Sequence, residues 1–225
     1  MGDAENAGVQ LANLEPRASA SLRLCVTTIG LDFEKQARDE GFLVVAGLDE
    51  VGRGCLAGPV VAAACVLDIS KPLPKGLNDS KKLSYKQRTV IAEQLRTDAV
   101  AFAVGQIEAD EIDRINILQA TKRAMQLAVA SLRPNPDFLL IDAVQLKELS
   151  LPQKAIIKGD AISASIAAAS ILAKTYRDNL MTEYDAVYPQ YGFARHVGYG
   201  TKAHFDAIRQ HGICPLHRKT FRGVA

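Results

Sequence analysis

Short apolar runs that alternate with helical patterns are the feature of this sequence that most constrains its fold. The runs FLVVAGL at residues 42–48 and PVVAAACVL at residues 59–67 are typical of buried strands. Ser84 and Gln87 form a capping box that predicts the start of a helix. Strands are predicted at 42–48, 59–67, 99–107, 138–141 and 155–158, and helices at 34–40, 84–96, 118–132, 163–181 and 202–211. This alternation predicts an α/β fold with a largely buried sheet.

Length and composition indicate one globular domain behind an N-terminal tail. With 225 residues, 48% of them apolar and 23% charged, the chain can bury a full core without disulfides or metal staples. Residues 1–31 show no clear periodicity, so we expect a flexible tail there. Residues 32–225 are expected to form the folded domain.

Membrane and export segments are not visible in the sequence. The longest charge-free apolar run, residues 54–67, is interrupted by Pro59 and is too short to cross a bilayer. No basic segment followed by an apolar block marks a secretory signal. The 4 cysteines form no Cys-x-x-Cys pair, which argues against a thiolate zinc site. We therefore expect a cytoplasmic protein with reduced thiols and no membrane partner.

The charge distribution points to a polyanion more clearly than the net charge of +2 does. Residues 71–96 carry seven basic and two acidic side chains, and residues 190–225 carry six basic and one acidic. Two separate basic segments on a nearly neutral chain suggest a surface that faces nucleic acid. Charge alone is equally compatible with an ordinary solvated surface.

Acidic residues follow three of the predicted strands. Asp49 and Glu50 come directly after the first strand, Asp142 after the run FLLI, and Asp160 after the last strand. A carboxylate beside the core must be neutralised by a basic side chain or a cation, because an unpaired buried charge costs several kcal/mol. Carboxylate oxygens suit Mg²⁺, and a pair of such ions is used for displacement at phosphorus. The alternative is that each acid is a helix cap or turn residue.

Other catalytic signatures are missing from the sequence. The 4 histidines have no zinc-ligand spacing, and there is no P-loop, dinucleotide-binding glycine motif or nucleophile elbow. Gly52-Arg53-Gly54 could let backbone amides approach a ligand, and the loop 78–82 carries two lysines suited to phosphate contact. A plain turn is the alternative for both segments.

Together these segments resemble the type 2 ribonucleases H, the bacterial ribonuclease HII family. The similarity begins at Phe42 and continues to the C-terminus, with the motifs in the family's order. The motifs are AGLDEVGRGCLAGPVVAAACVL at 46–67, LNDSKKLS at 77–84, LLIDA at 139–143, KGDAISASIAAASILAKTYRD at 158–178, YPQYGFARHVGYGTKAHFDAI at 188–208 and HRKTF at 217–221. Cys55 departs from the family, which usually has another small residue or proline there.

The resemblance implies a ribonuclease H-like fold, with a central mixed β-sheet flanked by helices and a helical C-terminal extension. It also implies a metal-dependent endonuclease that cleaves the RNA strand of RNA–DNA hybrids. Such an enzyme also cuts 5′ of single ribonucleotides in duplex DNA, leaving 5′-phosphate and 3′-hydroxyl ends, as ribonucleotide excision repair requires. The family's catalytic acids and ligands of two Mg²⁺ or Mn²⁺ ions correspond to Asp49, Glu50, Asp142 and Asp160.

Substrate contacts are also implied by the resemblance. The backbone of Gly52, Arg53 and Gly54 would recognise the 2′-hydroxyl, and Tyr199 of the GYGT motif would stack on the sugar after the junction. Ser80, Lys81 and Lys82 would hold backbone phosphates. Lys174 and Arg177 could balance the acidic charge or contact DNA. The expected partners are hybrid and ribonucleotide-containing DNA, bound by a monomer without an obligate protein partner.

Three alternatives remain at this point. A type 3 ribonuclease H shares many of these motifs but normally carries an added N-terminal substrate-binding domain. A nucleic-acid-binding module that kept the fold without activity would bind and not cleave. A phosphatase would turn over a generic phosphate monoester and would not need the two basic segments.

Overall fold

The computed structural model describes residues 29–224, and the predicted flexibility of residues 1–28 lies outside them. A five-stranded sheet has the order β3-β2-β1-β4-β5. Its strands are β1 (Val45–Val51), β2 (Val60–Val66), β3 (Ala101–Ile107), β4 (Phe138–Asp142) and β5 (Gln153–Ile156). The helices are α1 (Asp32–Asp39), α2 (Tyr85–Asp98), α3 (Ala109–Ile115), α4 (Ile117–Ser131), α5 (Ala164–Val187), α6 (Phe193–His196) and α7 (Lys202–His211), with 3₁₀ turns η1 (Ser80–Lys82), η2 (Gly159–Ala161) and η3 (Pro189–Tyr191).

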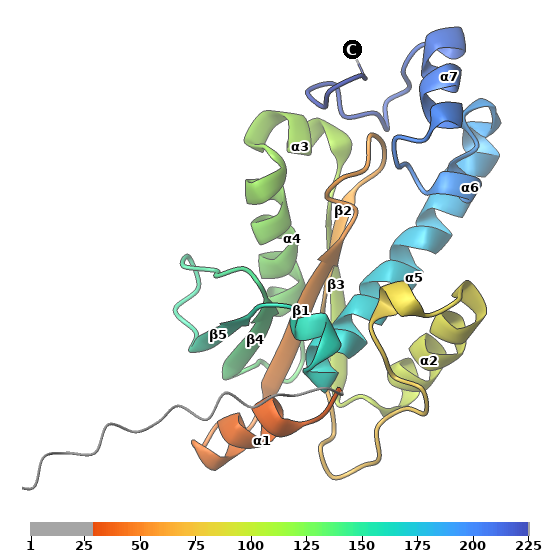
Figure 1. The fold of residues 1–225 in the computed structure, drawn as a ribbon. Helices are drawn as coiled ribbons and strands as arrows, with labels where there is room; N and C mark the ends of the chain where they lie inside the picture. Colours follow the sequence, from red (N-terminus) through yellow and green to blue (C-terminus); the bar gives the residue numbers. More distant parts are fainter. Residues whose placement is uncertain (1–28, 225) are drawn as a thin grey trace, which may run out of the picture.

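The sheet is mixed, as predicted. Strands β1, β2 and β3 form an antiparallel meander, whereas β4 and β5 run parallel to β1. Parallel strands need a crossover, and α4 supplies the one that leads into β4. The carboxyl ends of β1, β4 and β5 therefore meet at the same edge of the sheet (Figure 1).

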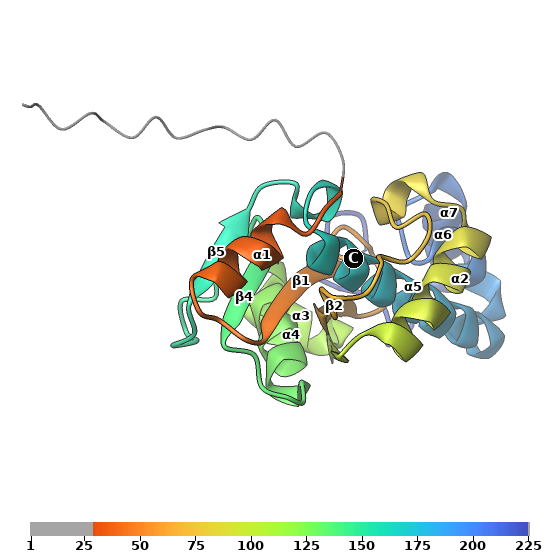
Figure 2. The ribbon, with the colours of Figure 1, turned by 90° about the horizontal axis from the view of Figure 1, so that it is seen from below.

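Helices cover both faces of the sheet, and alternate residues of β2 contact different helices. Val60, Ala62 and Ala64 pack in one cluster with α4, while Val61 and Ala63 pack in another with α2 and α5. The period of two follows from strand geometry, in which neighbouring side chains point to opposite faces. Helix α1 packs with α5 against β1 and β4, on the side away from α4 (Figure 2).

The helices approach the sheet very closely at two glycines. A Cβ added at Gly47 of β1 would lie 2.1 Å from the carbonyl carbon of Ser165, at the start of α5. A Cβ added at Gly105 of β3 would lie 2.2 Å from the carbonyl oxygen of Ala124 in α4. Only glycine permits such contact between a strand and the backbone of a helix.

Most predicted elements are present, with differences at their ends. The capping box at Ser84 and Gln87 is confirmed. The last strand ends at Ile156 and not at residue 158, because Lys158 has a φ of 57° and η2 begins directly after it. Helix α3 was not predicted from the sequence. Asn116, with a φ of 67°, separates α3 from α4 and caps the second helix with its side chain.

The C-terminal segment is a helical extension beyond one end of the sheet (Figure 1). Isolated bridges join it to the β1–β2 loop, between Cys55 and Tyr199 and between Ala57 and His217. Within residues 29–224, no helix is both long and apolar enough to span a membrane.

Candidate active site

Strand pairing brings the four predicted acids to one edge of the sheet. In the parallel pair β1 and β4, Leu48 lies beside Ile141, so the next residues, Asp49 and Asp142, come side by side. Glu50 follows Asp49 on β1. Asp160 lies in η2, which follows β5. Residues from three separate motifs of the sequence thus converge. Asp49 and Glu50 lie within β1, however, and not after the first strand as the sequence pattern predicted, because the strand runs on to Val51.

Asp49 is buried, with 5% of the residue exposed, which is the same fraction as for Asp160. Burial raises the pKa of its carboxyl well above the usual range, and the charges of Glu50 and Asp142 raise it further. Hydrogen bonds from the hydroxyl of Ser170 and, at 2.8 Å, from the backbone N–H of Glu50 act in the opposite direction. Without a cation nearby, the ionised form of Asp49 is therefore held at an energetic cost.

Glu50 has one paired and one unpaired oxygen. Its Oε1 accepts a hydrogen bond of 3.3 Å from Arg53, whereas its buried Oε2 has no partner among residues 29–224. Burial raises the pKa of this carboxyl, and the Arg53 guanidinium opposes that rise. A buried carboxylate oxygen without a donor is unusual in a folded protein, and its chemistry would suit a bound cation.

The other two acids are held by their immediate surroundings. Asp142 accepts a hydrogen bond of 2.7 Å from the backbone N–H of Gly159, while burial and the charge of Asp160 raise its pKa. Asp160 accepts one of 2.9 Å from the Nζ of Lys81, an ammonium group whose pKa rises because of this bond. Lys81 thus places a positive charge among the acids.

The donor set suits a hard divalent cation, although the ligands are not fully assembled. In the part of the chain that the structure describes, no three Asp, Glu, His or Cys side chains lie close enough together to bind one metal ion. The carboxylate oxygens match the preference of Mg²⁺ and Mn²⁺, and the unpartnered Oε2 of Glu50 offers a ligand at once. Asp160 is paired with Lys81 in this structure.

The Gly52–Gly54 loop lies directly beyond β1 and leaves its backbone approachable. Gly52 has a φ of 91°, which favours glycine, and it packs against Arg177. A Cβ added at Gly54 would meet no described atom within 4 Å, so this backbone faces open space. Arg218, fully buried, donates a hydrogen bond of 3.0 Å to the carbonyl of Arg53 and fixes the loop.

Tyr199 lies against this loop, bridged to Cys55, and 42% of the residue is exposed. Lys81 and Lys82 in η1 are exposed, as phosphate contacts would need to be. Ser80 is different, since it is buried and its Oγ lies 2.9 Å from the Oγ of Ser170. Ser80 therefore contacts Ser170, whose hydroxyl bonds to Asp49. The predicted contact of Ser80 with phosphate stays a prediction.

Three supporting residues were missed or misread in the sequence. Ser170 lies in a run of alanines, and a hydroxyl in such a buried helix was the available signal. Arg177 neither balances the acids nor contacts DNA, because it is fully buried. Arg177 and Arg218 instead donate to backbone carbonyls near the β1–β2 loop, those of Arg53, Ala57, Gly58, Pro59 and Val197. Lys174 pairs with Asp178 at 2.7 Å.

Two buried histidines support the Tyr199 loop, and their neighbours determine their tautomers. The Nδ1 of His204 lies 2.9 Å from the carbonyl oxygen of Tyr199 and must carry a proton to donate. His204 Nε2 then accepts from His217 Nε2 at 3.1 Å. His217 Nδ1 in turn accepts from the N–H of Cys214 at 3.0 Å. Both rings are therefore neutral in this arrangement.

We expect this pair to make stability depend on pH. Burial lowers the pKa of His204 from 6.5 to about 4 and also lowers that of His217. Below pH 6.5 the unfolded chain therefore binds more protons than the folded one, so stability is lost as the pH falls from about 6.5 to about 4. Urea unfolding at several pH values measures this loss. The His204→Gln variant should show a shallower dependence than wild type, and exposed His211→Gln an unchanged one. Equal slopes in all three would contradict the assignment.

Known proteins share this fold and much of this sequence. The fold is the ribonuclease H-like one, and the ribonuclease HII family model matches residues 46–224. A ribonuclease HII of Desulfitobacterium hafniense is 57% identical over 191 residues, which cover 85% of this chain and 73% of that protein. One from Chlamydia pneumoniae is 56% identical over 193 residues, which cover 85% and 89%. The chain belongs to the ribonuclease HII family.

Solved structures agree with this fold. The ribonuclease H2 of Pyrococcus horikoshii OT3 has a TM-score of 0.67 and 27% identity, over 81% of this chain and 95% of that one. A ribonuclease HII of Archaeoglobus fulgidus, solved in complex with PCNA, has a TM-score of 0.68 and 25% identity, over 80% and 96%. The chain is thus a ribonuclease H, an endonuclease for the RNA strand of RNA–DNA hybrids.

Proposed function

We propose that this enzyme uses Asp49, Glu50, Asp142 and Asp160 to hold two Mg²⁺ or Mn²⁺ ions and cuts 5′ of ribonucleotides, including single ones in duplex DNA. The observation that carries the proposal is the convergence of the four carboxylates beside an approachable glycine loop. Cleavage would leave 5′-phosphate and 3′-hydroxyl ends, as ribonucleotide excision repair requires.

The four acids would act as ligands and not as proton donors. Their mutual repulsion and burial raise the pKa values of Asp49, Glu50 and Asp142, and a bound cation would offset that cost. Two divalent ions at such a site supply a water of lowered pKa and stabilise the leaving oxygen of an in-line displacement. Asp49 accepts hydrogen bonds from the hydroxyl of Ser170 and from the backbone N–H of Glu50, which would hold its carboxylate in place for a cation.

The residues around the acids would select and position the substrate. The open backbone at Gly54 can approach a 2′-hydroxyl, which is both donor and acceptor and which DNA lacks. Lys81, which pairs with Asp160 in this structure, and its neighbour Lys82 would contact the phosphates of the backbone. Arg218, which is fully buried, donates to the carbonyl of Arg53 and would so hold the loop in place for the ligand.

End-labelled duplex DNA with one embedded ribonucleotide tests the proposal. Incubated with Mg²⁺, it should give a single cut on the 5′ side of the ribonucleotide, and no cut with chelator. Digestion of a continuous hybrid without this cut would favour a type 3 activity. Binding without cleavage of either substrate would favour an inactive binding module, and hydrolysis of a phosphate monoester alone would favour a phosphatase.

Tyr199→Ala is expected to impair cleavage at a single ribonucleotide more than cleavage of a long hybrid. Loss of a stacking aromatic costs about 1–3 kcal/mol, so the single-ribonucleotide rate should fall about tenfold or more. Tyr199→Phe keeps the ring and should retain most of this rate. Initial rates on the two substrates measure the difference, and equal losses on both would remove the junction-sensing role.

A further inference from the structure

Glu34 of α1 is a buried charged residue outside the four-acid site. Only 1% of it is exposed, and its Oε1 accepts three hydrogen bonds at the start of α5. The donors are the hydroxyl of Ser163 at 2.7 Å, the hydroxyl of Ser165 at 2.6 Å and the backbone N–H of Ser165 at 2.8 Å. All three donors lie at the N-terminal end of α5, where the helix carries partial positive charge that complements an acidic side chain.

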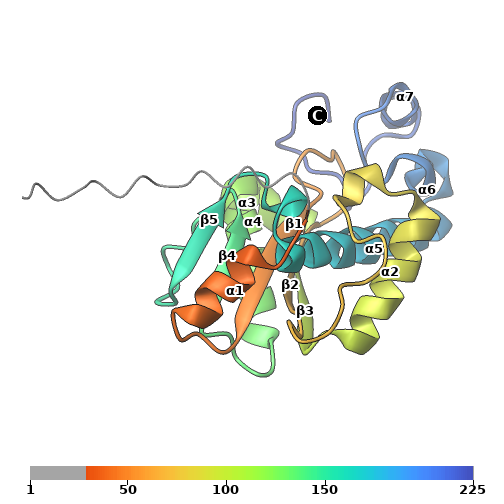
Figure 3. The same cartoon turned by 60° about the horizontal axis from the view of Figure 1, so that its bottom comes forward.

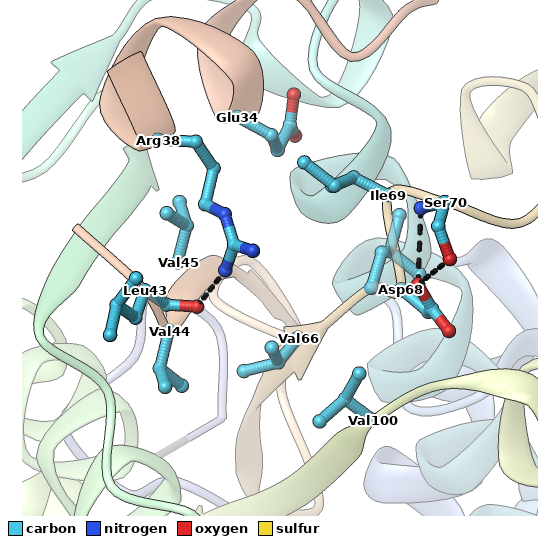
Figure 4. A pocket seen from close by; sticks show the side chains of 11 residues that line it. Glu34, Arg38, Leu43, Val44, Val45, Val66, Asp68, Ile69, Ser70 and Val100 are labelled. Atoms are coloured by element: carbon cyan, nitrogen blue, oxygen red, sulfur yellow. Dashed lines mark hydrogen bonds between the residues drawn. The ribbon is translucent and has the colours of Figure 1, made fainter. Parts of the chain in front are cut away.

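The nearby Arg38 does not serve as the partner of this carboxylate. Figure 4 shows the two side chains on the wall of a pocket between α1 and the strands, pointing in different directions. Arg38 turns down to donate to the carbonyl oxygen of Leu43. The start of α5 is therefore what Glu34 contacts, and the contact ties α1 to α5.

Gly30 makes a second contact with the start of α5, through its backbone. The N–H of Gly30 donates to the carbonyl oxygen of Ile162 at 3.2 Å, and the N–H of Ala164 donates to the carbonyl oxygen of Gly30 at 2.9 Å. Residues 30–34 therefore hold residues 162–165 through both backbone and side-chain bonds. Figure 3 shows α1 beside the start of α5, in front of β1.

Residues 162–165 directly follow the turn η2, which carries Asp160. The N–H groups of Ile162 and Ser163 donate to the carbonyl oxygen of Gly159 at 3.1 and 2.9 Å. The N–H of Gly159 in turn donates to Asp142 at 2.7 Å. Any displacement at the start of α5 is therefore passed to the backbone of Asp160 and to the hydrogen bond that holds Asp142.

We propose that Glu34 is a positioning residue of the active site, which holds the start of α5 so that Asp160 and Asp142 keep the separation that metal binding needs. The inference rests on the proposed metal site. It assigns a role to α1, which lies before the residues that the family model matches. Such outer contacts orient ligands and commonly change metal affinity when they are lost.

Mn²⁺ binding, followed by the electron paramagnetic resonance signal of free Mn²⁺, tests this role apart from turnover. Glu34→Gln keeps the size and removes the charge, and it should weaken Mn²⁺ binding about tenfold. Glu40→Gln, at an exposed carboxylate just after the same helix, should bind like wild type. The kcat of Glu34→Gln should recover at high Mn²⁺ concentration, with KM for the duplex little changed. Glu34→Ala should show a larger effect of the same kind if it folds.

Coupling to Asp160 distinguishes positioning from general support. In an Asp160→Asn background, Glu34→Gln should weaken Mn²⁺ binding by a smaller factor than it does in wild type, because one of the two ligands that it positions is already altered. A Glu34→Gln protein with a lowered melting temperature but wild-type Mn²⁺ affinity would overturn the inference alone. Wild-type protein that neither binds Mn²⁺ nor cleaves would overturn the proposed function, and this inference with it.

Discussion

Asp49→Asn is expected to abolish cleavage while binding of the hybrid survives. The substitution keeps the shape of the side chain and removes one charge from the four-acid site. We expect a fall of about a thousandfold or more in kcat, equivalent to about 4 kcal/mol, because metal ligands contribute several kcal/mol to the transition state. Binding should be retained or slightly tighter, since one anion fewer repels the phosphates. Single-turnover cleavage and a binding titration measure the two effects.

The stability of the same variant is the control that separates loss of catalysis from unfolding. The pKa of Asp49 is raised in the folded state, so its stabilising contribution is present at low pH and lost as the pH rises through the folded value. At neutral pH without metal, Asp49→Asn should therefore melt at a higher temperature than wild type. Asp39→Asn, at an exposed position on α1, should change neither activity nor melting. Near-normal cleavage by Asp49→Asn would contradict the metal assignment.

Gly47→Ala is expected to destabilise the fold by about 3 kcal/mol or more, at the upper end of the cost of overpacking. A Cβ at this position would lie 2.1 Å from the carbonyl carbon and 2.5 Å from the carbonyl oxygen of Ser165. These are backbone atoms of α5 and cannot rotate away as a flexible side chain would. The helix must shift as a unit, and it carries the segment that follows Asp160. Urea unfolding measures the loss of stability.

Gly54→Ala is the matched control for stability. Its φ is not positive, and an added Cβ there meets no described atom within 4 Å. It should unfold within about 0.5 kcal/mol of wild type, as surface substitutions usually do. If Gly47→Ala and Gly54→Ala were equally stable, the contact between β1 and α5 would have room for a methyl group, which would contradict the prediction.

The sequence predicted the parts of the site that depend on local pattern. Apolar runs marked the strands, and the acids that follow them indicated a site because sites assemble at strand ends in α/β sheets. The structure adds the reason why Asp49 and Asp142 meet, which is the parallel pairing of β1 with β4. The GRG and GYGT motifs, which match the family, indicated that Gly54 and Tyr199 contact the substrate. Periodicity alone would have given a plain turn for Gly54 and an ordinary packed aromatic for Tyr199.

The parts that were not predicted depend on distant contacts. Arg177 and Arg218 are buried because carbonyl groups of the β1–β2 loop surround them, and nothing in their local sequence shows those carbonyls. Glu34 lies in a short helix with acidic neighbours and resembles a solvated residue. Its partners, Ser163 and Ser165, lie about 130 positions further along the chain. Helix α3 was missed since its boundary with α4 depends on the left-handed conformation of Asn116.

The central claim is that the four carboxylates form one divalent-metal site, and anomalous scattering tests it most directly. Crystals would be grown with Mn²⁺ and a duplex that carries one ribonucleotide, and data collected at the manganese edge. We predict anomalous peaks bounded by Asp49, Glu50, Asp142 and Asp160, with Lys81 moved from Asp160 to a phosphate of the duplex. A bound duplex with no peak at these acids, and with Lys81 still on Asp160, would contradict the account.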